Sequence, residues 1–192
     1  MSPSDGDLIR QCIGGRRRAF DELVARYEGS VYNVCLRMLG DPADASDVGQ
    51  EAFVRAYLAL DRFDVSRPFR PWILRIATNL CINAAKARRG GQVSLDDPSP
   101  AQAEPAEGGL DIADAGRGPE AVLESRELHD RVRRAVLALP ETYRAVAVLR
   151  HVEGLSYEEI AEATGMAMGT VKTHIFRAKK LLREKLSDLF AE

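Results

Sequence analysis

Cations, a hydroxyl and an aromatic ring share one face of the stretch GTVKTHIFRAKKLLR, residues 169–183. At 100° per residue, a helix here puts four apolar side chains in a narrow inward stripe and fans the others outward. Cations release counterions from a phosphate backbone, and an aromatic ring can cover a thymine methyl group. This face therefore has the chemistry to read duplex DNA. The inward stripe is Val171, Ile175, Ala178 and Leu182; the outer face is Lys172, Thr173, Phe176, Arg177, Lys179, Lys180 and Arg183.

The residues before this stretch predict a short helix that would position it. Ser156 and Glu159 have the spacing of a capping box, and Leu155 and Ile160 that of a hydrophobic staple. Gly165 ends this helix, and a second one starts near Gly169, which is the spacing of a helix-turn-helix. The alternative is a solvated basic helix, with His174 as a boundary residue. The capped helix and tight turn favour DNA reading.

A second group of residues has the chemistry of a single-strand reader. Between residues 72 and 86 a Trp, an Arg, two amides and a Lys recur every three or four residues on one side of a predicted helix. Trp and Arg planes stack on unpaired bases, amides bond base edges, and Lys holds the backbone. The members are Trp72, Arg75, Asn79, Asn83 and Lys86.

The loop DRFDVSRPFRPW, residues 61–72, precedes this row. Phe63 and Phe69 stand there among three arginines, in a position to wall a pocket for one flipped base. The alternative is that the two Phe rings and Trp72 belong to the core. For Phe69 the two interpretations are equally weighted, and only the neighbours of Trp72 favour a functional role. The arginines are Arg62, Arg67 and Arg70.

A helix predicted from Pro42 to Leu60 carries apolar side chains almost all round. Val54 and Leu58 stand beside Asp47, Gln50 and Glu51. Phosphates would be repelled by the two carboxylates, so this mixture suits a protein partner better than DNA.

Periodicity is helical throughout, apart from a segment rich in Pro, Gly, Ala and acid, so we predict an all-α fold. Residues 1–89 carry 14 Lys and Arg against 11 Asp and Glu, residues 90–121 carry 1 against 7, and residues 122–192 carry 12 against 11. Two small helical domains, 1–90 and 121–192, are thus expected on either side of a flexible acidic linker, 91–120. We also expect a helix over 20–38, with a possible break at Gly29-Ser30, and one starting near Pro71.

Other chemistry finds little support in the sequence. The sequence contains no HExxH motif, no phosphate-binding glycine loop, no CxxC motif and no Ser-centred elbow. A helical enzyme, a metal site and a cofactor are therefore all disfavoured. Cys12, Cys35 and Cys81 stand among apolar neighbours and are expected to be buried thiols. Neither a membrane span nor a secretory leader is predicted, which favours a cytoplasmic location.

Together these segments resemble the bacterial alternative sigma factors of the extracytoplasmic-function (ECF) type, in the sigma-70 family. DASDVGQEAFVRAYLALDRFD is similar to the core-binding helix of region 2, and FRPWILRIATNLCIN to the promoter-melting and minus-ten segment. LPETYRAVAVLRHVEGLSYEEIAEATGMAMGTVKTHIFRAKKLL is similar to region 4. The resemblance covers nearly everything except the linker.

The resemblance implies a subunit that gives RNA polymerase its promoter choice, and it implies an anti-sigma factor as a second partner. Region 2 would span 1–90 and region 4 would span 121–192. Three sets of residues receive roles by the resemblance. Core polymerase would contact Asp47, Gln50, Glu51, Phe53 and Val54; the melted minus-ten strand would contact Arg62, Phe63, Phe69, Trp72, Arg75, Asn79, Asn83 and Lys86; the minus-thirty-five duplex would contact Lys172, Thr173, Phe176, Arg177 and Lys180.

Three residues depart from the family pattern. Gly49 stands in mid-helix, Ala167 replaces a frequent Pro or Ser, and His174 replaces a common Arg. The promoter bases therefore cannot be copied from relatives. The competing hypothesis is a stand-alone two-domain regulator that binds a palindromic site without polymerase.

Overall fold

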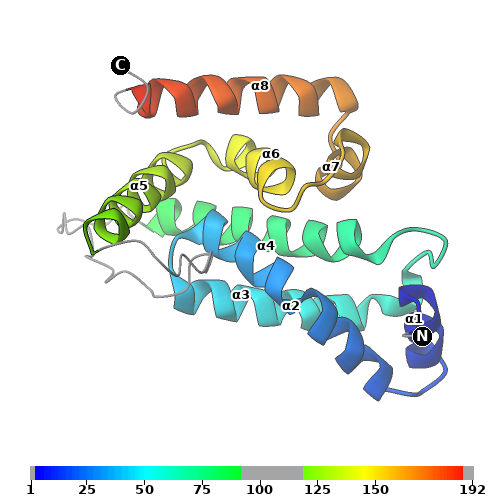
Figure 1. The fold of residues 1–192 in the computed structure, drawn as a ribbon. Helices are drawn as coiled ribbons and strands as arrows, with labels where there is room; N and C mark the ends of the chain where they lie inside the picture. Colours follow the sequence, from blue (N-terminus) through cyan, green and yellow to red (C-terminus); the bar gives the residue numbers. More distant parts are fainter. Residues whose placement is uncertain (1–2, 92–118, 188–192) are drawn as a thin grey trace.

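A computed structural model describes residues 3–91 and 119–187, and all regular structure within them is helical (Figure 1). The all-α prediction is confirmed. The predicted linker lies almost wholly outside the described residues. The helices are α1 (Asp5–Ile13), α2 (Arg18–Leu39), α3 (Pro42–Leu58), the 3₁₀ turn η1 (Leu60–Arg62), α4 (Phe69–Gly91), α5 (Pro119–Leu137), α6 (Glu141–His151), α7 (Tyr157–Thr164) and α8 (Met168–Lys185).

Helices α1 to α4 form the first bundle. α2 runs without a break through Gly29-Ser30, contrary to the possible interruption, and ends at Gly40, whose φ of 79° lies in the left-handed region that glycine adopts without strain. The next helix starts at once, because the Asp41 side chain accepts a hydrogen bond from the Asp44 N–H at 2.9 Å. These caps fold the chain back into an antiparallel pair.

Small residues let α3 approach α2 closely. Ala45, Ala52 and Ala56 are fully buried on one side of α3, and Gly49 is buried in the same row. A Cβ added at Gly49 would lie 3.7 Å from the Val31 side chain, which is ordinary contact. The site therefore has room for alanine, and the glycine only lowers the helix propensity.

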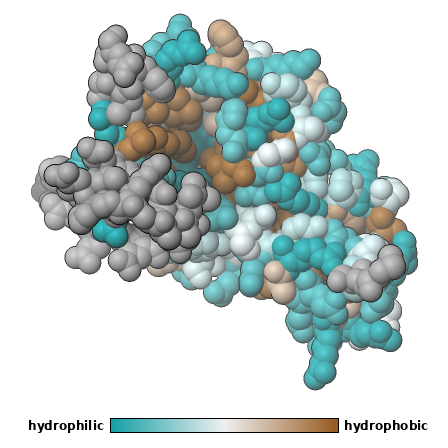
Figure 2. All heavy atoms as spheres, in the orientation of Figure 1, coloured by the Kyte–Doolittle hydropathy of each residue, from teal (hydrophilic) through white to brown (hydrophobic). Residues whose placement is uncertain are grey.

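Helices α5 to α8 form the second bundle, whose core includes Leu149, Leu155, Ile160 and Val171. The two bundles are packed together, since α4 lies against α6 and α7 and their buried side chains join one core. In Figure 1, α8 lies above α6 and α7, which lie above α4. Figure 2 shows a largely hydrophilic face, with hydrophobic side chains gathered below α8, where α5 and α6 meet it.

Candidate nucleic-acid interface

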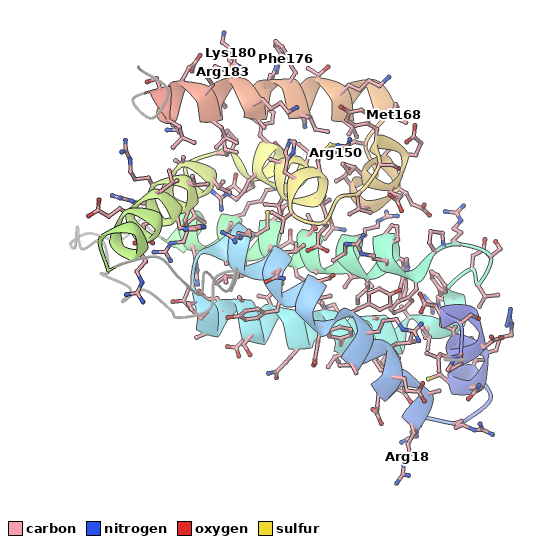
Figure 3. The ribbon with its side chains drawn as sticks, viewed as in Figure 1. Arg18, Arg150, Met168, Phe176, Lys180 and Arg183 are labelled. Carbon is pink, nitrogen blue, oxygen red and sulfur yellow. The ribbon has the colours of Figure 1, made fainter. Side chains whose placement is uncertain are left out.

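The outer side of α8 is open to solvent. Val171, Ile175 and Ala178 are buried, as the helical projection predicts, while Leu182 is half-buried. Phe176 is 70% exposed, and Figure 3 shows its ring pointing away from the rest of the molecule. Such a face can lie in a groove without repacking the core. We call these exposed residues the α8 face: Lys172, Thr173, Phe176, Arg177 and Lys180.

The helix before α8 is held by the predicted caps. The Ser156 hydroxyl accepts from the Glu159 N–H at 3.1 Å, and the Glu159 carboxylate accepts from the Ser156 N–H at 2.7 Å. Leu155 and Ile160 are both buried, and Gly165 ends α7 with φ of 70°. The local sequence alone thus specifies the first helix and the turn of the helix-turn-helix.

Two α8 side chains are in contact with α6. Arg177 donates from Nη1 to the Tyr143 hydroxyl at 3.1 Å. The rings of Tyr143 and His174 meet edge to face, with centroids 4.9 Å apart. Tyr143 is not among the residues predicted from the sequence, because it lies more than thirty positions from Arg177 on an otherwise ordinary helix.

The surroundings of α8 are electropositive. Burial lowers the pKa of His151, at the end of α6, and the charges of Lys179 and Arg150 lower the same pKa further. In the described residues no acidic side chain lies on α8 before Glu184. An anionic ligand is therefore favoured over a cationic one.

The predicted row on α4 keeps its polar members on the surface. Trp72, at its start, is half-buried, so one part of the indole remains available. Arg62, in η1, is also exposed. Arg75 lies beside the turn at Gly165, where its Nη2 would be 3.8 Å from an added Cβ. We call this surface the α4 row: Trp72, Arg75, Asn79, Asn83 and Lys86.

The two phenylalanines before the row are core residues. Phe63 is 8% and Phe69 1% exposed, which corrects the expectation that they wall an open base pocket. Trp72 packs on them at centroid distances of 4.7 and 5.5 Å, and Tyr27 of α2 contacts Phe69 at a centroid distance of 5.5 Å. The long-range contact with α2 decides their burial. They form a rigid base for the indole.

The exposed side of α3 combines acids with aliphatic residues. Val54 and Leu58 are 53% and 73% exposed. Phe53 is half-buried against Phe20, at a centroid distance of 6.5 Å. We call this surface the α3 patch: Asp47, Gln50, Glu51, Val54 and Leu58.

Among the described residues no group of three or more His, Cys, Asp or Glu side chains is placed to hold a metal ion. The same residues include no helix that is long and apolar enough to cross a membrane. All three cysteines are buried and unpaired by disulfides.

Two family models match the chain: sigma-70 region 2 over residues 23–90 and sigma-70 region 4 over residues 129–182. The ECF RNA polymerase sigma factor SigW of Bacillus subtilis is 39% identical over 181 residues, which cover 94% of this chain and 96% of that protein.

Two solved structures share the architecture. CnrH in complex with the cytosolic domain of CnrY matches with a TM-score of 0.68 at 29% identity, over 97% of this chain and 99% of that one. The sigma factor RpoE of Bartonella quintana, in complex with the anti-sigma factor NepR, matches with a TM-score of 0.62 over 88% of this chain and 96% of that one; at 22% identity it shows the fold alone.

Proposed function

Because the chain belongs to the ECF sigma factors of the sigma-70 family, we propose that its three exposed surfaces divide promoter recognition and polymerase binding between them. As a sigma factor it directs transcription and is not itself an enzyme. The α8 face reads the minus-thirty-five duplex, the α4 row holds the melted minus-ten strand, and the α3 patch binds core RNA polymerase. The stand-alone regulator gives way, because both sigma regions match in order.

The observation that carries the minus-thirty-five assignment is the composition of the α8 face. Lys172, Arg177 and Lys180 surround an exposed Phe176 on a helix whose opposite side is fixed in the core. Lysines contribute affinity through phosphates, whereas a planar Arg can bond a guanine edge with two hydrogen bonds. Lys180→Ala should weaken binding to all promoters alike and lower the salt dependence of that binding. Arg177→Ala should relax discrimination at one base pair.

The minus-ten assignment is supported by the mixture of groups on the α4 row. Trp72 offers a partly open indole above Phe63 and Phe69, and Asn79 and Asn83 offer amides about two and three turns further along. Base stacking on an aromatic ring contributes about 1–3 kcal/mol per base. Lys86, at the end of the row, and Arg62, exposed in η1, hold phosphates. Phe63 and Phe69 act by supporting Trp72.

The polymerase assignment is supported by the apolar part of the α3 patch. Val54 is exposed on a helix that also carries Asp47, Gln50 and Glu51, and phosphates would not tolerate those acids. Phe53 contributes from its half-buried position. Glu51→Lys or Gln50→Ala should weaken association with core polymerase. Glu22→Lys, an equivalent charge change at an exposed position of α2, is the matched control.

An anti-sigma factor that covers these surfaces, and action in the cytoplasm where polymerase works, complete the proposal. The test is transcription by purified core polymerase on a pool of genomic promoters, with and without the protein. Specific start sites should appear only with the protein and disappear with Asn79→Ala or Arg177→Ala. Tight duplex binding by the protein alone, without any initiation, would overturn the proposal.

A further inference from the structure

Resting on the proposed function, we propose that Tyr143 is a positioning residue for minus-thirty-five recognition. Its hydroxyl accepts a hydrogen bond from Nη1 of Arg177, and its ring supports the imidazole of His174 from the side. Tyr143 is itself half-buried against Leu139 and Ala147, so it provides a fixed reference point on α6. Two side chains of α8 are thereby set from a neighbouring helix before DNA arrives.

The chemistry of arginine makes this contact useful. A guanidinium has five N–H donors in a rigid fork, so one bond from Nη1 to Tyr143 leaves other donors for a base or phosphate. An unrestrained arginine must be ordered when it binds, at a cost that corresponds to about 2- to 10-fold in affinity. The Tyr143 hydroxyl reduces that cost and fixes the direction of the fork.

The test is a double-mutant cycle in the reconstituted holoenzyme. Tyr143→Phe keeps the ring against His174 and removes only the hydroxyl. It should weaken binding to the selected promoter by about 2- to 10-fold and reduce discrimination at the base pair that responds to Arg177→Ala. In the Arg177→Ala background it should have no further effect. Tyr157→Phe, in the same bundle but away from α8's outer face, is the matched control.

The outcomes separate the two levels of the proposal. If Arg177→Ala changes nothing, the assigned role of Arg177 fails. If Arg177→Ala has its effect but Tyr143→Phe has none, or has the same effect in both backgrounds, positioning by Tyr143 is overturned. The urea midpoint of Tyr143→Phe should stay that of the unsubstituted chain, which excludes a general loss of structure.

A different observation carries a second inference: ion pairs join the two bundles beside the α4 row. Arg70 donates from Nη2 to the Glu153 carboxylate at 2.7 Å and to the Glu153 backbone carbonyl at 2.8 Å. The Glu153 side chain is only 4% exposed. Nearby, Arg67 contacts Glu162 at 3.2 Å. Two arginines that flank the minus-ten surface are thus engaged by carboxylates of the second bundle.

We call the form in which the two bundles are packed together the closed arrangement. In this form the chain cannot read both promoter elements at once. One layer of helices separates α8 from α4 (Figure 1), and packed helices lie about 8–10 Å apart, so the two surfaces are roughly 20 Å apart. Elements centred about 25 base pairs apart lie roughly 85 Å apart along a duplex, at about 3.4 Å per pair. We infer that the closed chain is an autoinhibited form and that the pairs to Glu153 and Glu162 are its latch.

The test compares two double variants. The latch variant carries Glu153→Gln and Glu162→Gln, and the control variant, with the same change of charge, carries Glu127→Gln and Glu158→Gln. Both control glutamates are exposed. The latch variant should show a larger radius of gyration by X-ray scattering, where a compact chain of this length gives about 16 Å. It should also bind a single-stranded minus-ten oligonucleotide more tightly than the control does.

An unchanged radius of gyration in the latch variant would overturn the latch. An increased radius with no gain in oligonucleotide binding would keep the latch and refute autoinhibition of the minus-ten surface. An equal gain in oligonucleotide affinity in the latch and control variants would show that the loss of negative charge alone strengthens DNA binding. That result would also overturn the inference.

Discussion

Replacing Arg144 should uncouple the two bundles. This arginine of α6 is 7% exposed, and its guanidinium donates to the backbone carbonyls of Met38, Leu137 and Leu139. Met38 lies in the last turn of α2, Leu137 is the last residue of α5, and Leu139 lies two residues beyond it. One cation therefore stabilises the negative ends of two helix dipoles, one from each bundle.

The magnitude follows from those bonds. Arg144→Met keeps much of the apolar stem but removes every donor. A hydrogen bond to a charged group contributes about 1.5–3 kcal/mol, while the desolvation of the buried charge, several kcal/mol, offsets part of the sum. Carbonyls left without a donor in the interior cost about 1–3 kcal/mol. We expect a net loss of about 2–4 kcal/mol in the free energy of unfolding.

The assay is urea unfolding followed by two probes. Trp72, the only tryptophan, reports the first bundle, and circular dichroism reports all helices. The two transitions should coincide in the unsubstituted chain and separate in Arg144→Met, because the variant lacks the shared cation. Arg150→Met is the matched control: Arg150 donates to one carbonyl, Leu155 at 2.7 Å, within its own bundle. Figure 3 shows Arg150 between α6 and α7. Coincident transitions in Arg144→Met, or equal losses in both variants, would refute this reasoning.

Four further outcomes are expected. Gly49→Ala should raise the free energy of unfolding by about 0.5–1 kcal/mol. Gly40→Ala should lower it, because the φ of Gly40 is 79° and an added Cβ would lie 2.6 Å from the Leu137 side chain. Urea titration of both variants checks the sign of each change. Ser156→Ala should cost about 1 kcal/mol by loss of the capping box, seen as a lower urea midpoint by circular dichroism. A hydrogen bond with Cys35, followed by burial, raises the pKa of Cys81, so a thiol reagent should modify these cysteines only as the chain unfolds. Burial, and then the hydrogen bond to Asp5, raises the pKa of Tyr27 to about 12. Because the folded pKa exceeds the unfolded one, the contribution of Tyr27 to the free energy of unfolding is present below about pH 10 and is lost as the pH rises toward 12. Urea unfolding across that pH range should show this loss of stability in the unsubstituted chain and not in Tyr27→Phe.

Local chemistry was enough to predict the caps and the inward faces. Ser156 and Gly165 act through neighbours within a few residues, so the sequence contains both partners of each interaction. The buried stripe of α8 was predictable for the same reason, since the period of a helix is fixed. The start of α4 at Phe69 rather than Pro71 is within the usual spread of helix ends.

Residues whose role depends on a distant partner were not predictable in this way. Phe63 and Phe69 have the same local pattern as a base-stacking pair, and only contact with Tyr27 and Trp72 decides their burial. The burial of Arg144 could have been predicted from one feature of the sequence. The run AVAVL follows it directly, and a helix segment so apolar must be largely buried, together with the cation at its start. Tyr143 and Glu153 left none, since each acts on a side chain more than thirty positions away.

The closed arrangement also limits which ligand can open it. A ligand shifts a conformational equilibrium only through a difference in affinity for the two states. The α8 face is exposed in the closed form, so the minus-thirty-five duplex that we propose as its ligand needs no separation of the bundles to reach it. The α3 patch is exposed in the same way, so the polymerase contact that we propose for it gives no preference for the open form. Opening is therefore favoured by a ligand that binds the open form more tightly, as we predict for the minus-ten strand, or by a partner that holds both bundles at separate, fixed places, as a polymerase bound to both regions would. Either must offset the contacts of Arg70 and Arg144 across the seam.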